Sequence, residues 1–281
     1  MDWLIEAFEP SFMQRALIGS LIAVVATSLV GTWVVLRGLA FLGDALAHGV
    51  IPGIALAVLW SFNPLIGAFV AAIVMSGLVS MVSNRSTVRE DTAIGLLFVG
   101  MLSLGIVIVS RAGSFSTEVT ALLFGDVLGV TTEDIRSQAI AAAIMVIATL
   151  VLYRPFLALT FNRDKAQTLG MRPQLAQTAL LVLLALSVVA SFQAIGTLLI
   201  FGLLIGPPAT ALLIARRVPV IMVTSMLLGA VAVVSGLLVS YHHGTAGGAT
   251  IAGISVTQFF LLLAVREAAE ALKRPIRPAA T

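Results

Sequence analysis

Asp44 and His48 lie four residues apart in the segment 43–53, inside a long apolar run. On an α-helix, residues i and i+4 project from one face about one turn apart, so this carboxylate and imidazole could bind one small cation. Pro52 has no N–H and therefore cannot donate to the carbonyl of His48 four residues earlier. The segment thus offers a carboxylate oxygen, a ring nitrogen and a free backbone oxygen.

A second group of polar residues, Tyr241, His242 and His243, follows another apolar run. The two histidines could receive a cation from outside the membrane. Adjacent residues point in different directions on a helix, however, so they form a poor chelate on their own. The alternative interpretation is a set of polar residues at a membrane boundary.

The sequence Gly206-Pro207-Pro208 interrupts a third apolar run. Because proline lacks an N–H, the two prolines leave the carbonyls of Leu203 and Leu204 without intrahelical donors. Such carbonyls could line a pathway in a broken helix and supply oxygen donors. A simple kink packed against neighbouring helices is the alternative.

The composition places these residues in a membrane. Of 281 residues, 59% are hydrophobic and only 10% are charged, whereas a soluble domain has about 25% charged residues. The chain has no cysteine, which excludes thiolate ligands and disulfides. Clustered basic residues for a nucleic-acid partner are absent. The phosphate-binding loop, the serine nucleophile elbow and the zinc helix of metalloproteases are also absent, so we expect a protein that is not an enzyme and does not itself hydrolyse ATP.

A membrane-spanning helix needs roughly 20 predominantly apolar residues. The sequence predicts an all-α, polytopic fold with about nine spans, eight to ten being compatible with the pattern. The predicted spans are 12–36, 39–60, 63–82, 92–110, 135–153, 174–192, 194–215, 220–240 and 250–265.

The segment 119–130 is apolar but only about a dozen residues long, so a short re-entrant helix is expected there. With an external N-terminus, this topology places nearly all basic residues inside, leaving only Arg15, Arg111 and Arg136 outside. Counting 119–130 as a full span would remove this positive-inside bias.

In this topology Asp44 and His48 lie deep in the second span. An aspartate at the centre of a membrane helix costs roughly 2.5–3.5 kcal/mol, so such residues usually serve a cation or proton pathway. A structural pair, with His48 hydrogen-bonded to Asp44 or to a neighbouring helix, is the alternative. A carboxylate and a neutral imidazole suit Mn²⁺, Zn²⁺ or Fe²⁺. Because two side chains of one helix cannot enclose a metal, other spans must contribute.

The polar connection 154–173 faces the inside in this topology. Within it, residues 161–171 read as a short amphipathic helix that ends at Gly170, with Pro173 before the next span. A plain surface loop is the alternative.

Several motifs in order resemble the membrane permease subunits of manganese, zinc and iron ABC importers, the ABC-3 family. The resemblance covers essentially the whole chain. It rests on Val34-Val35-Leu36-Arg37, Phe41-Leu42-Gly43-Asp44-Ala45-Leu46-Ala47-His48, Pro52-Gly53, Glu90-Asp91-Thr92-Ala93-Ile94-Gly95-Leu96-Leu97-Phe98, Leu123-Phe124-Gly125-Asp126, residues 161–171, Gln193-Ala194-Ile195-Gly196 and Gly206-Pro207-Pro208-Ala209-Thr210-Ala211.

The resemblance implies one permease domain over residues 1–281, which forms a homodimer in the bacterial cell membrane. It implies two cytosolic ATP-binding subunits and an extracellular metal-binding lipoprotein as partners, with no permanently bound cofactor. Asp44 and His48 match the residues that line the metal path. The segment 161–171 matches the coupling helix that docks into the ATPase, through Phe161, Asn162, Arg163, Asp164, Lys165, Leu169 and Gly170.

The chain departs from the family pattern in two places. Ala47 replaces the usual serine before the histidine, and Tyr241-His242-His243-Gly244 lacks the acidic residue that often follows the eighth span. We therefore expect inward transport of a divalent transition metal, with the metal itself left open. The alternatives are a permease for a metal chelate or cofactor, and a secondary transporter that uses Asp44 and His48 as a proton relay.

Overall fold

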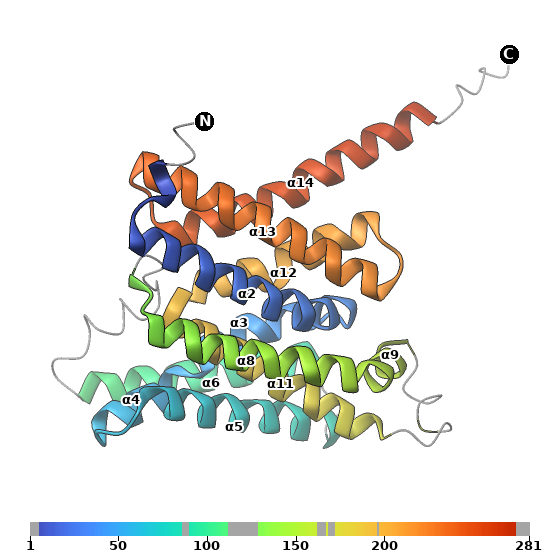
Figure 1. Cartoon of the computed structure of the whole chain (residues 1–281). Coiled ribbons are helices and arrows are strands. Elements are labelled where there is room, and N and C mark those ends of the chain that lie inside the picture. Colours follow the sequence, from blue (N-terminus) through green and yellow to red (C-terminus); the bar gives the residue numbers. More distant parts are fainter. Residues whose placement is uncertain are drawn as a thin grey trace, which may run out of the picture.

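The computed structural model describes residues 6–85, 90–111, 129–161, 167, 172–195 and 197–273. These residues form helices and no strands, and the long helices run side by side through one bundle (Figure 1). The helices are α2 (Ser11–Leu36), α3 (Ala40–Gly49), α4 (Ile51–Leu59), α5 (Pro64–Arg85), α6 (Glu90–Arg111), α8 (Thr132–Val151), α9 (Tyr153–Phe161), α11 (Pro173–Ile195), α12 (Thr197–Ile214), α13 (Val218–His243) and α14 (Gly247–Lys273). The prediction of an all-α fold is confirmed.

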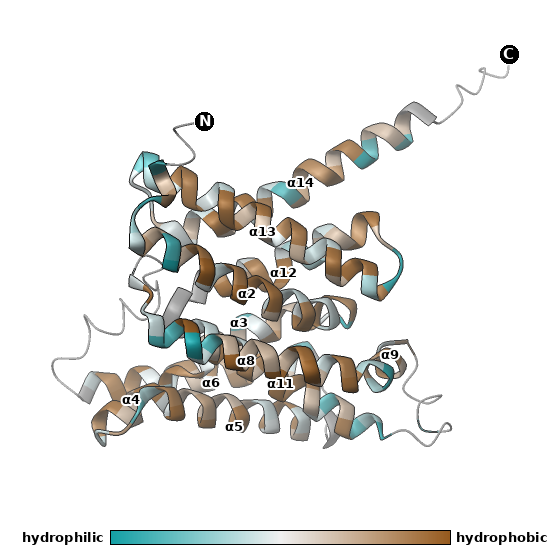
Figure 2. Ribbon diagram, viewed as in Figure 1, coloured by the Kyte–Doolittle hydropathy of each residue, from teal (hydrophilic) through white to brown (hydrophobic). Residues whose placement is uncertain are grey.

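Each predicted span corresponds to helical structure. Eight helices or helix pairs in the described residues are long and apolar enough to cross a membrane, with α3 and α4 together forming one of them. The ninth is α12, whose apolar part, Leu199–Ile214, is shorter. Figure 2 shows apolar colour along the helices and hydrophilic colour mainly near their ends. Length and composition therefore define a multi-pass membrane protein.

The end of α6 and the start of α8 lie at the same end of the bundle (Figure 1). The predicted topology requires this arrangement, because a re-entrant segment between the two helices enters and leaves the membrane on the same side. Of the predicted re-entrant segment 119–130, only Gly129 and Val130 belong to the described residues, so the re-entrant helix stays a prediction.

One part of the predicted connection 154–173 is helical. Helix α9 buries Phe156 and Leu159, and the rings of Tyr153 and Phe156 each lie 5.6 Å from that of Trp33 in edge-to-face contacts. The sequence predicts only a polar connection from residue 154, but this aromatic packing on α2 stabilises a helix. Helical structure therefore covers Tyr153–Phe161 of the predicted connection.

Glycine and alanine allow the close approach of α4 and α5. A Cβ added at Gly53 would overlap the carbonyl oxygen of Gly67, and a Cβ added at Gly67 would overlap that of Gly53. Small residues let membrane helices approach until their backbones touch. Helix α4, whose first turn contains Pro52, is therefore held firmly against α5.

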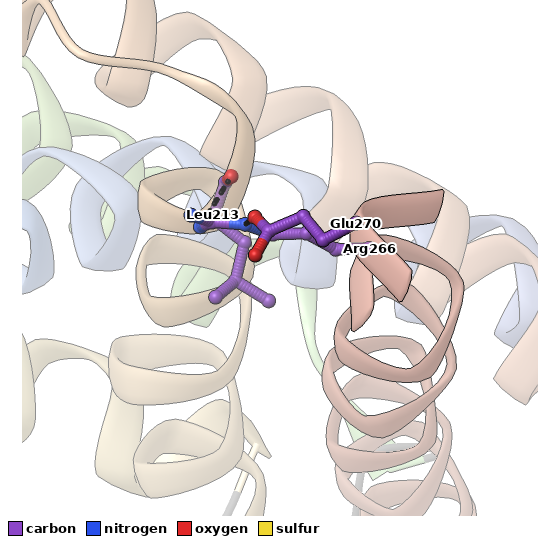
Figure 3. Close-up of polar contacts among 3 residues, drawn as sticks. All are labelled: Leu213, Arg266 and Glu270. Carbon is purple, nitrogen blue, oxygen red and sulfur yellow. Dashed lines mark hydrogen bonds and ion pairs between the residues drawn. The ribbon is translucent and has the colours of Figure 1, made fainter. Parts of the chain in front are cut away.

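At its far end, α14 continues beyond the predicted span and leaves the bundle (Figure 1). The Arg266 Nη1 donates to the carbonyl of Leu213 at 3.1 Å, and its Nε lies 3.0 Å from Glu270 Oε1 (Figure 3). Leu213 is the second-last residue of α12, where carbonyls have no intrahelical donor. Arg266 thus caps α12 and joins it to α14.

We expect Arg266→Ala to destabilise the protein by about 0.5–1 kcal/mol, because it removes a charged donor from the end of α12. Thermal unfolding of the detergent-solubilised protein should show a melting temperature lower by about 2 °C. Glu270→Ala is the control and should cost less than Arg266→Ala, since it removes only an exposed ion pair and leaves the hydrogen bond to the Leu213 carbonyl in place. An equal or larger loss for Glu270→Ala would contradict the capping role.

Candidate metal-pathway site

The turn before α3 fixes where the candidate site begins. Helix α2 ends at Leu36, and Gly38 adopts a left-handed conformation with φ +69°. The Gly38 N–H donates to the carbonyl of Val35 at 3.0 Å, and the Leu39 N–H donates to that of Val34 at 2.9 Å. This is a Schellman motif, which suits glycine because a side chain would be strained there. The tight turn lets α3 start at Ala40.

The span predicted at 39–60 is divided near Pro52 into two helices. Helix α3 ends at Gly49, α4 begins at Ile51, and Pro52 lies in the first turn of α4. The Val50 N–H donates to the Leu46 carbonyl at 3.2 Å and is also directed at the carbonyl of His48. The break follows from the missing N–H of proline, and it places His48 in the last turn of α3.

Asp44 and His48 face the same side of α3. The distance between His48 Nε2 and Asp44 Oδ1 is 3.6 Å. Two ligand atoms, each about 2.0–2.2 Å from one tetrahedral metal, lie roughly 3.4 Å apart. The side chains of Asp44 and His48 are 33% and 31% exposed, whereas residues 45–47 are at most 2% exposed. The pair is therefore accessible and spaced for one ion.

An aromatic ring from α6, that of Phe98, lies beside the pair. The Phe98 ring is 5.8 Å from the His48 ring in an edge-to-face arrangement, and 6.0 Å from the ring of Phe41. These contacts fix one side of the imidazole and leave its nitrogens for other partners. Within the described residues, no group of three or more His, Cys, Asp or Glu side chains is placed to hold a metal.

The structure places Leu203 and Leu204 in the packed interior, where they are 1% and 0% exposed. A Cβ added at Gly31 would overlap the carbonyl oxygen of Leu204, so this carbonyl lies directly against the backbone of α2. The Leu204 side chain lies against Gly43, the residue before Asp44. The two prolines stay inside a continuous helix, and Pro207 lies near Gly229 of α13. This arrangement favours packing over an open carbonyl-lined path.

Tyr241, His242 and His243 form the last turn of α13, and Gly244 follows with φ +63°. The rings of Tyr241 and His242 lie 5.2 Å apart and perpendicular. Helix α13 packs against α2, α12 and α14, whereas α3 packs against α6, α12, α11, α5 and α2. The structure thus places α2 and α12 beside both groups and does not join them into one site.

The segment predicted to contact an ATPase is mostly outside the described residues. Phe161 is the last residue of α9 and is 71% exposed. The other residues predicted to make this contact lie outside the described residues: Asn162, Arg163, Asp164, Lys165, Leu169 and Gly170.

Sequence reasoning did not assign roles to Phe98 and Gly31. Helical spacing gives no signal for either, because both act through contacts between helices.

The long apolar helices and their packing define a polytopic α-helical membrane protein. Residues 9–266 match the ABC 3 transport family, and the chain belongs to that family. It is the membrane permease type of subunit in an ABC transporter, a multi-pass integral protein of the bacterial cell membrane. The resemblance predicted from the motifs is confirmed.

Named relatives transport different metals. The chain is 33% identical to a probable iron transport system membrane protein of Haemophilus influenzae over 94% of this chain and 97% of the relative. It is 36% identical to the manganese import system permease protein ScaB of Streptococcus parasanguinis over 89% of each chain. PsaBC from Streptococcus pneumoniae, solved in complex with a Fab, has a chain with 30% identity and a TM-score of 0.85, covering 97% of this chain and 99% of that chain.

Proposed function

We propose that this chain is the permease of an importer for Mn²⁺, Zn²⁺ or Fe²⁺, with Asp44 and His48 as transient ligands of the transported ion. The main support is their 3.6 Å separation on an accessible side of a membrane helix. A structural pair would be expected to be buried and hydrogen-bonded, since ionisable groups inside a membrane need partners. The relatives named for manganese and iron agree with a metal cargo.

A second copy of the chain would complete the path. Asp44 and His48 provide too few ligands to enclose an ion, and α6 beside them is largely exposed, with Leu96 73% and Val99 58% exposed. Of the candidate spans, α6 has the smallest buried share and lies directly beside the incomplete site, which fits a homodimer interface. The ion would then pass between the two copies.

Energy would come from separate ATP-binding subunits that dock at residues 161–171, and an extracellular metal-binding lipoprotein would deliver the ion. The position of Phe161 supports the docking site, because α9 leads an exposed apolar side chain out of the bundle at that point. We assign no permanent cofactor to the chain; the metal is its cargo.

The test is radioactive manganese uptake into proteoliposomes that contain this chain, its ATP-binding subunit and its binding protein. We expect uptake only when ATP is present on the side of the ATP-binding subunit, with competition by Fe²⁺ and Zn²⁺ ranking the metals. Vesicles without the ATP-binding subunit are the control. Uptake that continues without ATP and follows a pH gradient would replace this proposal by a proton-coupled transporter.

A further inference from the structure

A groove separate from the Asp44–His48 site lies between α5, α8 and α11. It has a volume of about 350 Å³, and its walls are mainly aliphatic and aromatic side chains, including Phe69, Ile144 and Leu186. Two polar residues, Asp134 and Ser137, also line it. Grooves with mostly apolar walls and few polar groups are typical binding sites for largely apolar ligands.

In the predicted topology, the lining residues fall in the outer half of the membrane. Helices α5 and α8 begin, and α11 ends, at the end of the bundle that the basic residues predict to be outside (Figure 1). Ile144 lies twelve positions after Thr132, the first residue of α8, which corresponds to a depth of about 18 Å. One half of the hydrocarbon core is about 15 Å thick. The groove therefore extends from the outer boundary to roughly the bilayer centre, which is the length of one leaflet.

The polar end of the groove carries a negative charge. Asp134 Oδ2 accepts from the Thr131 N–H at 3.0 Å and from the Thr131 hydroxyl at 2.6 Å. No hydrogen bond or ion pair of Asp134 Oδ1 occurs in the described part of the chain, and the carboxylate is partly exposed. The donors from Thr131 are neutral, and the N-terminus of α8 offsets only part of the charge of Asp134. A cationic group at the outer boundary would complement it.

We propose that this groove binds one phospholipid of the outer leaflet, with an acyl chain between α5, α8 and α11 and an ammonium headgroup beside Asp134. The apolar walls match an acyl chain, the length matches one leaflet, and the carboxylate favours phosphatidylethanolamine over an anionic lipid. The site is independent of the proposed transport function. A second copy of this chain would instead be expected beside Asp44 and His48, which are on α3.

The test uses phosphatidylethanolamine with a photoactivatable group in its acyl chain. The protein is placed in vesicles of phosphatidylethanolamine and phosphatidylglycerol, and the labelled residues are identified by mass spectrometry. We expect Ile140 and Ile144 to be labelled at least about five times more than Ile147, which is on the same helix and 62% exposed but outside the groove. Equal labelling of Ile147 would overturn the proposal. In a separate measurement, disulfide cross-links between two copies of an Ile140→Cys variant would also overturn it.

Two variants make the test specific. Ala141→Phe fills the groove and should reduce labelling of Ile144 at least about fivefold, while Ala143→Phe, an equal change at an exposed position outside it, should not. Asp134→Asn keeps an oxygen that can accept from Thr131 and removes the charge. It should abolish the preference for phosphatidylethanolamine over photoactivatable phosphatidylglycerol. A preference that survives in Asp134→Asn would exclude the headgroup contact, and labelling unchanged in Ala141→Phe would exclude the acyl-chain site.

Discussion

Asp44→Asn is expected to reduce metal uptake at least about 100-fold while the protein still assembles in the membrane. The substitution keeps the size of the side chain and removes the charge that pairs with a divalent ion. Even changes that act on ligands indirectly cost 10–100-fold in metal sites, so loss of a ligand charge should cost more. Assembly should survive, because a neutral side chain enters a membrane helix more easily than an aspartate. Uptake by proteoliposomes and size-exclusion chromatography measure the two effects.

Glu133→Gln is the matched control for Asp44→Asn. It makes the same carboxylate-to-amide change at an exposed position in the first turn of α8, and uptake should stay at the unmodified level. His48→Gln should give a smaller loss than Asp44→Asn, because it removes a neutral ligand. If Asp44→Asn transports at the normal rate, Asp44 is not a ligand on the metal path and the pair is structural.

Much of the fold follows from the sequence because hydrocarbon imposes strict rules. A backbone in lipid must satisfy its own hydrogen bonds, so long apolar runs become helices. The Asp44–His48 pair was predictable once this segment was known to be helical, because helical spacing alone brings the two side chains together. Helix α9 was not predictable in this way. Its stability depends on Phe156 and Tyr153 packing against Trp33, a residue more than 100 positions earlier.

The rest of the candidate site depends on contacts between helices. Proline chemistry predicts that the Leu204 carbonyl loses its donor, but it cannot predict where that oxygen points. The structure directs it at Gly31. The contact between the rings of Phe98 and His48 likewise requires α6 to lie beside α3. Local patterns therefore identify which groups are unusual, and only the three-dimensional packing shows what each one meets.

Gly31→Ala is expected to destabilise the protein by about 1–3 kcal/mol and to lower metal uptake. The new Cβ would overlap the carbonyl oxygen of Leu204 and lie 3.1 Å from Pro208 Cγ. Both atoms belong to rigid parts of α12, so α2 and α12 must separate, and overpacking of this kind costs about 1–3 kcal/mol. Because Leu204 also packs against Gly43, the shift would reach the residue beside Asp44. Melting temperature in detergent and uptake per folded protein measure the two effects.

Gly100→Ala distinguishes this close contact from a general effect of changing a helical glycine. A Cβ at Gly100 would have no atom within 4 Å, and alanine favours a helix by about 0.5–1 kcal/mol over glycine. The same substitution should therefore leave stability unchanged or raise it slightly at Gly100, and lower it at Gly31. Equal effects at both positions would show that the proline-freed carbonyl of Leu204 is not held by close packing, and would restore it as a candidate oxygen donor to the transported ion.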